Sequence, residues 1–136
     1  PGALETVLAE LRAHVQGRLF CLVGCGGDRD TGKRPIMGQI AARYADHVII
    51  TDDNPRSEDP DAIRKAMLEG APSAEEIGDR GAAIERAIAM AGAGDIVLLA
   101  GKGHEQGQVY AGQTLHFDDR EIARAAMRPP DKGAPP

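Results

Sequence analysis

The sequence of 136 residues has few aromatic side chains: two Tyr, two Phe and no Trp. Proteins that bind single-stranded nucleic acid stack bases on aromatic rings, so that class is poorly supported here. The chain also has fewer basic than acidic residues, with 16 Lys and Arg and 21 Asp and Glu, which gives a net charge of −5. An acidic chain argues against a nucleic-acid footprint and against binding to an anionic membrane surface. We therefore expect no nucleic-acid and no membrane partner.

Cysteine and long apolar runs are scarce as well. Cys21 and Cys25 are the two cysteines, and without a cluster of partner His residues they predict neither a disulfide framework nor a metal site. We expect two reduced thiols. No apolar run approaches the roughly 18 residues that suggest a membrane span. The chain opens on Pro1-Gly2 with no Met and no signal-peptide pattern, so we expect a processed product or a piece of a longer protein.

The amino-acid composition is typical of one globular domain. Hydrophobic residues make up 42% of the chain and charged residues 27%, and the length suits a single core. We expect one domain over residues 1–128. Residues 129–136 include four Pro and predict a disordered tail.

Segments with the apolar spacing of helices alternate along the chain with short apolar runs typical of buried strands. Helical spacing, capping residues and glycine stops predict helices over 4–15, 34–44, 59–69, 84–90 and 118–127. Short apolar runs that end at glycine or polar residues predict strands over 19–23, 48–51 and 96–99, and residues 109–116 read as a hairpin. This order predicts an α/β fold, a Rossmann-like three-layer sandwich. Its central sheet is mostly parallel, with a C-terminal hairpin or antiparallel edge.

Three glycine-rich or polar loops follow the three predicted strands. They cover Gly24–Arg34, Thr51–Arg56 and Gly101–Glu105. In open α/β sheets, ligands bind outside the carboxyl ends of the strands. We therefore expect the three loops to form one composite site.

The first loop resembles a phosphate-binding loop only in part. Gly27–Lys33 satisfies G-x-x-x-x-G-K, but Arg34 stands where a Ser or Thr hydroxyl should hold Mg²⁺. Two Asp residues inside the loop would also oppose a triphosphate. Arg29, Lys33 and Arg34 still form a basic cluster suited to a carboxylate or phosphate. A tight turn whose charges pair with one another explains the cluster about as well.

The other two loops add groups that suit a zwitterion. Arg56 beside the rigid Asn-Pro corner is placed for bidentate carboxylate binding, and Glu105 could receive an ammonium group. Together the loops offer Arg29 and Arg56 for carboxylates, and Asp53 and Glu105 for ammonium groups. This set fits an amino acid better than a nucleotide or an apolar ligand.

Three motifs in this order resemble the Mur ligases. They are Gly24–Asp30 with Gly32–Pro35, then Asp53–Arg56, then Gly101–Glu105, and the resemblance covers about residues 3 to 127. Thr51-Asp52 and the segment 117–120 also fit. Within the family, the motifs are most similar to the type that adds meso-diaminopimelate to UDP-N-acetylmuramoyl-L-alanyl-D-glutamate.

The resemblance implies that this chain is the last of three domains of a cytoplasmic, bacterial ligase of peptidoglycan precursor synthesis. ATP, Mg²⁺ and the UDP-sugar peptide would bind through the first two domains, and we expect no cofactor bound to this piece alone. The reaction implied runs through an acyl phosphate on the D-glutamate side chain, which the amine of diaminopimelate attacks. We name no catalytic residue in this chain and expect it to be inactive by itself.

Residue by residue, the resemblance implies contacts to diaminopimelate. Asp53, Asn54 and Arg56 match the signature that recognises this amino acid, Gly101 and Glu105 match further contacts, and Arg29 matches an arginine that binds one of its carboxylates. Lys33 and Arg34 are candidate contacts for an anion or nucleotide. Lysine lacks the second carboxylate and would leave a desolvated guanidinium unpaired, so Asn54 and Arg56 favour diaminopimelate over lysine.

One departure and three alternatives stay open. The family's first strand of this domain precedes the stretch matching Pro1–Leu8, so we expect that strand to be missing and an exposed sheet edge to favour self-association. The alternatives are a nucleotide-binding module that uses Gly27–Lys33, a free-standing binding module for amino acids or peptides, and a relative that adds lysine or another diamine.

Overall fold

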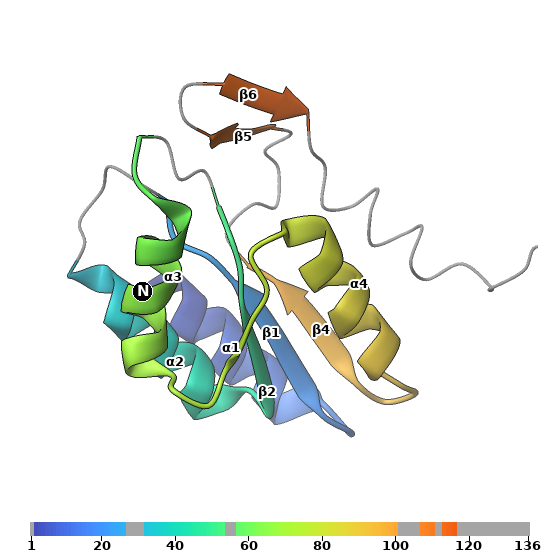
Figure 1. The fold of residues 1–136 in the computed structure, drawn as a ribbon. Helices are drawn as coiled ribbons and strands as arrows, with labels where there is room; N and C mark the ends of the chain where they lie inside the picture. Colours follow the sequence, from blue (N-terminus) through green and yellow to red (C-terminus); the bar gives the residue numbers. More distant parts are fainter. Residues whose placement is uncertain (1, 27–31, 54–56, 101–106, 111–112, 117–136) are drawn as a thin grey trace, which may run out of the picture.

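The structure, a computed structural model, describes residues 2–26, 32–53, 57–100, 107–110 and 113–116 (Figure 1). The elements follow one another as α1 (Gly2–His14), β1 (Leu19–Val23), α2 (Lys33–Tyr44), β2 (His47–Ile50), α3 (Pro60–Gly70), β3 (Glu75–Glu76), α4 (Arg80–Met90), β4 (Ile96–Leu99), β5 (Gly107–Tyr110) and β6 (Gln113–His116). The predicted helix over 118–127 and the predicted tail over 129–136 lie outside the described residues.

Four of the strands form one parallel sheet in the order β3-β2-β1-β4. In the centre, Cys21 is in register with Val48 of β2 and Leu98 of β4. Strands β5 and β6 form a separate antiparallel pair, with Val109 opposite Thr114. The predicted parallel α/β fold with a C-terminal hairpin is therefore confirmed.

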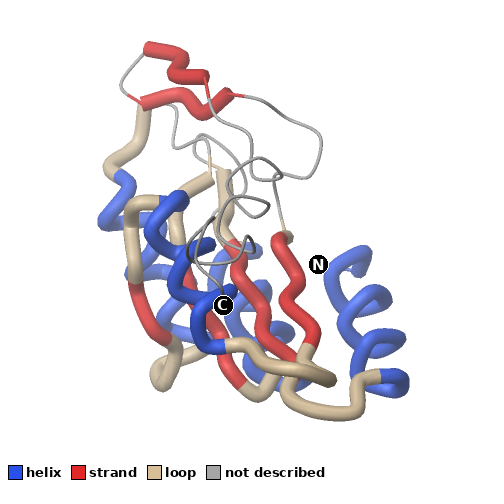
Figure 2. The backbone as a smooth tube through the Cα atoms, turned by 90° about the vertical axis from the view of Figure 1, so that its right-hand side faces the viewer, coloured by secondary structure: helices blue, strands red, loops and turns tan. Residues whose placement is uncertain are grey.

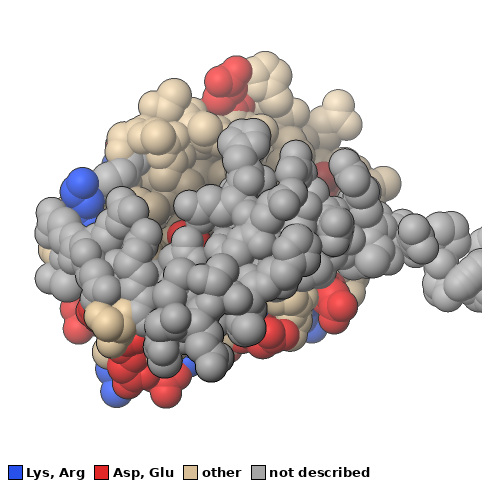
Figure 3. Space-filling model, turned by 90° about the horizontal axis from the view of Figure 1, so that it is seen from above, with Lys and Arg blue, Asp and Glu red and all other residues tan. Residues whose placement is uncertain are grey.

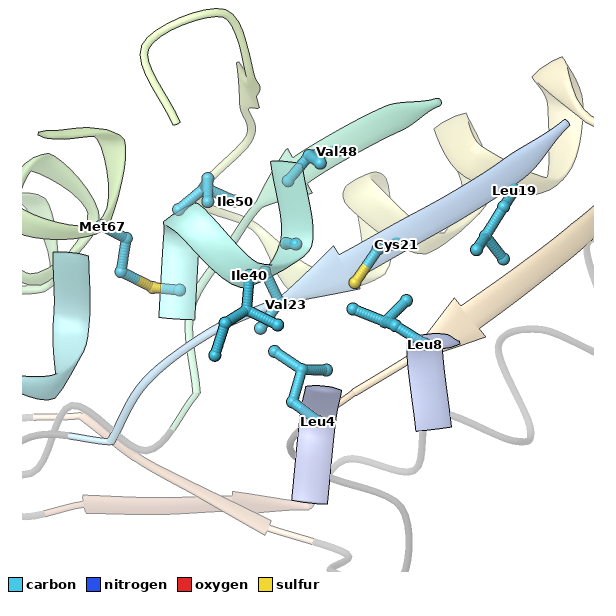
Figure 4. Close-up of a cluster of buried hydrophobic side chains, with 10 residues drawn as sticks. Leu4, Leu8, Leu19, Cys21, Val23, Ile40, Val48, Ile50 and Met67 are labelled. Atoms are coloured by element: carbon cyan, nitrogen blue, oxygen red, sulfur yellow. The ribbon is translucent and has the colours of Figure 1, made fainter. Parts of the chain in front are cut away.

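Helices cover both faces of the sheet, as Figure 2 shows. All five residues of β1 are buried, and alternate side chains face opposite layers. On one face, residues of β1 and β2 pack with α1, α2 and α3 around the cluster drawn in Figure 4: Leu4, Leu8, Leu19, Cys21, Val23, Ile40, Val48, Ile50 and Met67. On the other face, Leu22 and Ile49 pack against Ala83, Ile84 and Ala87 of α4. This arrangement is the predicted three-layer sandwich.

Two elements differ from the expectation. Strand β3 was not predicted, because its two residues are glutamates and it joins the sheet by backbone pairing with Ile49 and Ile50. Helix α4 was predicted from Ile84 but begins at Arg80, where the side chain of Asp79 caps it by accepting a hydrogen bond from the Ala82 amide at 2.9 Å. Arg80, Gly81, Ala82 and Ala83 form this first turn and include no large apolar residue, so the apolar spacing in the sequence marks the helix only from Ile84.

Two of the expectations from the sequence concern the cysteines and membrane-spanning segments. Both cysteines are free thiols, and burial raises the pKa of Cys21 to about 12. Within the described ranges, no helix is both long enough and apolar enough to cross a bilayer.

Two aspartates hold the amino end of β1. An Asp46 carboxylate oxygen accepts a hydrogen bond from the Leu19 amide at 2.7 Å. Asp95 accepts from the amides of Arg18 at 2.7 Å and Gly92 at 2.8 Å. These backbone donors lower the pKa of both carboxyl groups below the usual 3.8.

We expect these two aspartates to make the stability of the chain depend on acid pH. Because their pKa values are lower in the folded state, their contribution is complete above about pH 5 and is lost as the pH falls through the unfolded-state and then the folded-state values. Urea unfolding at pH 7, 5 and 3.5 should show a falling free energy of unfolding. Asp46→Asn with Asp95→Asn should flatten that fall, while Glu85→Gln at an exposed site on α4 should not. An unchanged slope in the double variant would contradict this assignment.

Candidate functional site

The carboxyl ends of β1, β2 and β4 lie at the same edge of the sheet, the upper edge in Figure 1. The connections from β1 to β2 to β3 run outward in one direction, and the chain then returns to place β4 on the other side of β1. A reversal of this kind is where open α/β sheets bind their ligands. The first two predicted loops begin at this edge, directly after β1 and β2, and the third lies outside the described residues.

The ends of β1 and β2 are in direct contact at Gly24. A Cβ atom at this position would lie 2.7 Å from the Thr51 carbonyl oxygen and 3.0 Å from the Cβ of Asp53. The Thr51 amide also donates to the Val23 carbonyl at 3.0 Å. Glycine is required here because the neighbouring atoms are mainly backbone, and it brings Asp53 against the start of the first loop.

Arg34 holds the first loop to the segment that precedes α3. Its guanidinium forms an ion pair with Glu58, with Nη2–Oε1 at 2.6 Å, and donates to the Gly26 carbonyl at 3.3 Å. The side chain is buried. Lys33, the first residue of α2, is exposed instead.

Arg34 and Asp53 both act on the thiol of Cys25. Burial raises the pKa of this thiol to about 11, while the Arg34 charge lowers it and the Asp53 charge raises it. The first and second loops therefore share one electrostatic environment at this edge. Such a high pKa keeps Cys25 protonated at neutral pH, so it is not a nucleophile of the kind that low-pKa cysteines provide.

Arg64 of α3 holds Asp52, which directly precedes the predicted Asp53–Arg56 signature. Its Nη1 donates to the buried Asp52 carboxylate, Nη2 pairs with Asp61, and Nε donates to Glu76 at 2.9 Å. The Thr51 hydroxyl donates to the Gly78 carbonyl at 3.2 Å. The chain that leaves β2 is thus fixed by side chains of α3 and by the segment after β3.

Arg80, in the first turn of α4, connects the ends of β2 and β4. Its Nη1 donates to the Asp52 carbonyl at 3.0 Å and its Nη2 to the Ala100 carbonyl at 3.1 Å. The residue is 1% exposed. An arginine has donors in a planar fork, so one side chain can hold two carbonyl groups at a set separation.

The structure describes three of the predicted site residues, and the charges of two of them act on the same thiol. The charges of Asp53 and Arg34 both shift the pKa of Cys25, while Lys33 lies at the exposed start of α2. Arg29, Asn54, Arg56, Gly101 and Glu105 lie outside the described residues, so their roles stay predictions. Sequence reasoning missed the supporting residues Glu58, Arg64 and Arg80. The capping Asp79 before Arg80 was the one local signal for the last of these.

The described surface around this edge shows more acidic than basic side chains when it is viewed from above (Figure 3). Among the residues that the structure describes, no three His, Cys, Asp or Glu side chains gather as a metal site. Position 34, where a phosphate-binding loop needs a hydroxyl for Mg²⁺, has a buried guanidinium paired with Glu58. This position does not fit a Mg²⁺–nucleotide site.

Comparison with known proteins gives one consistent picture. A family described as "Mur ligase, glutamate ligase domain" matches residues 1–103. The chain is 60% identical over 128 residues to the UDP-N-acetylmuramoyl-L-alanyl-D-glutamate--2,6-diaminopimelate ligase of Mesorhizobium japonicum, covering 94% of this chain and 26% of the relative. It is also 60% identical over 119 residues to the enzyme of the same name from Caulobacter vibrioides, covering 88% and 24%.

A solved structure of a ligase with this name has a similar fold. It superposes with a TM-score of 0.88 at 47% sequence identity, and the match covers 93% of this chain and 27% of that structure. The chain therefore spans about a quarter of the length of the relatives that it matches.

Proposed function

The chain belongs to the Mur ligase family, whose glutamate ligase domain matches it, and from this premise we propose that it positions an amino acid for amide-bond formation. The amino acid is meso-diaminopimelate, and the acceptor is UDP-N-acetylmuramoyl-L-alanyl-D-glutamate. The activity belongs to the complete ligase of peptidoglycan precursor synthesis, of which this chain forms one domain. In a bacterial cell, this ligase works in the cytoplasm.

The chemistry assigns the chain a binding role. In the complete enzyme, ATP and Mg²⁺ would bind through the other domains and supply the phosphoryl group that turns the D-glutamate side-chain carboxylate into an acyl phosphate, with release of ADP. The diaminopimelate amine then attacks the acyl carbon, phosphate leaves, and the amine loses a proton. Arg29 and Arg56 would pair with carboxylates of the amino acid, and Asp53 and Glu105 with an ammonium group. Holding the amine in place and excluding water speeds this step without a catalytic side chain from this domain.

The observation that carries the proposal is the shared edge of the sheet. Strands β1, β2 and β4 end at that edge, and the three motif segments follow these strands in the sequence of a chain 60% identical to a relative named as a diaminopimelate ligase. The lysine-adding alternative lacks a partner for Arg56, because lysine has no second carboxylate. The nucleotide-binding alternative is disfavoured by the buried Arg34–Glu58 pair. The remaining alternative is a free-standing module that binds amino acids or peptides at the same site. Such a module would give no ligase activity when it is joined to the other two domains, so recovered ligation would exclude it.

A two-dimensional amide NMR titration tests the binding step on the chain itself. We expect shifts with meso-diaminopimelate at amides around Asp53 and after β4, and no comparable shifts with L-lysine. Equal responses to both amino acids would contradict the proposed specificity. A response to ATP, with none to diaminopimelate, would favour the nucleotide-binding module.

A further inference from the structure

The bridge made by Arg80 has a consequence for the proposed amino-acid site, and this inference rests on the proposed function. Arg80 donates to the carbonyl of Asp52 at 3.0 Å and to that of Ala100 at 3.1 Å. Asp52 directly precedes Asp53, and Ala100 directly precedes Gly101. One buried side chain thus holds the two backbone positions from which the second and third motif segments leave the sheet.

The proposed ligand demands a fixed spacing between these two segments. The carboxylate and the ammonium group of an amino-acid head group are attached to one carbon atom, so their separation cannot adapt to the protein. The proposed receivers are divided between the segments, with Asp53 and Arg56 after β2 and Glu105 after β4. Receivers on two loops match such a head group only when the loops keep one separation to within about 0.5 Å.

The remaining described contacts tie the end of β2 or of β4 to β1, to a helix or to the segment after β3, and none of them joins β2 to β4 directly. Arg64 holds the Asp52 carboxylate from α3, and Gly24 packs against Thr51 at the end of β2. The Ala100 amide donates to the Leu22 carbonyl at 2.9 Å. Of the arginine contacts that the structure describes, those of Arg80 are the ones that join the ends of β2 and β4 across β1.

We propose that Arg80 is a positioning residue for the amino-acid substrate. Its guanidinium holds the Asp52 and Ala100 carbonyl groups, the last described backbone positions before the residues proposed to receive the head group of diaminopimelate, at one separation. It touches no reacting atom and acts through the backbone of Asp52 and Ala100.

A chimera tests the proposal in a complete ligase. This chain replaces the matching quarter of the Mesorhizobium japonicum relative, to which it is 60% identical, and steady-state kinetics are measured below the unfolding temperature. For Arg80→Met we expect the KM for meso-diaminopimelate to rise about 10- to 100-fold, with the KM for ATP changed less than about twofold. Arg80→Lys keeps a donor and should fall between Arg80→Met and the unchanged chimera.

Ile84→Ala is the matched control, because Ile84 lies one turn further along α4 and is fully buried in the core. It should lower the unfolding temperature while leaving the KM for diaminopimelate within about twofold. If Arg80→Met does not fold, Arg80→Lys must still show the selective rise in KM. KM values in the Arg80 variants that match those of Ile84→Ala would overturn the positioning role. An unsubstituted chimera that turns over ATP but does not use diaminopimelate would instead overturn the proposed function.

Discussion

Arg56→Ala lowers kcat/KM for meso-diaminopimelate by about 30- to 5,000-fold in the complete ligase. The proposed partner of Arg56 is the distal carboxylate of the ligand, and truncating one member of a desolvated charge pair costs about 2–5 kcal/mol. Activity with L-lysine should not fall in proportion, because lysine has no carboxylate at that end. The measurement is the ratio of the two kcat/KM values in the chimera before and after substitution.

Arg43→Ala is a suitable control for this change. Arg43 is an exposed arginine of α2, with 67% of its side chain accessible and Glu5 at 3.5 Å. Exposed pairs of this kind contribute about 0–1 kcal/mol, so both kcat/KM values should stay near those of the unsubstituted enzyme. A parallel loss with both amino acids in Arg56→Ala would contradict the role of Arg56 as a reader of the distal carboxylate.

Gly70→Ala should destabilise the fold by about 2–3 kcal/mol and lower the unfolding temperature by about 10 °C. Helices α2 and α3 pack with their backbones in contact, and a Cβ at Gly70 would meet the Pro35 carbonyl oxygen and lie 2.9 Å from the Gln39 amide nitrogen. Gly38 faces the Met67 carbonyl oxygen in the same way. Because these atoms are backbone, the helices must separate to admit a methyl group. Thermal unfolding followed by circular dichroism measures the loss.

Gly2→Ala is the same substitution at a helical glycine with open space around it. Alanine favours helix over glycine by about 1 kcal/mol, so this variant should be as stable as the original chain or slightly more stable. If Gly70→Ala is also stabilising, the close backbone packing of α2 and α3 is contradicted.

The strands and helices that the sequence predicted are those with a strong local signal. Strands β1 and β4 are runs of apolar residues that end next to glycine or alanine, and α3 begins at the Asp59-Pro60 cap that its sequence indicates. Strand β3 has no such signal, because two glutamates form it through backbone bonds to β2. The spacing of apolar residues indicates which side chains face a core. It cannot predict β3, because that strand is held by backbone pairing with β2.

The common edge at which β1, β2 and β4 end was also predictable, whereas the arginine contacts at that edge were not. A parallel sheet places the loops after its strands at one edge, so the order of elements was sufficient. The contacts of Arg34 with Glu58, Arg64 with Asp52 and Arg80 with Ala100 join distant parts of the chain. No spacing in the sequence marks such pairs, because they form only when the helices have packed on the sheet.

The most direct measurement of the central claim is ligation by the chimera that contains this chain. Purified chimera is supplied with ATP, Mg²⁺, UDP-N-acetylmuramoyl-L-alanyl-D-glutamate and either meso-diaminopimelate or L-lysine, and the tripeptide product and ADP are quantified. We predict product with meso-diaminopimelate and little or none with L-lysine. A folded chimera that forms the acyl phosphate but joins neither amino acid, or joins lysine equally well, would contradict the account.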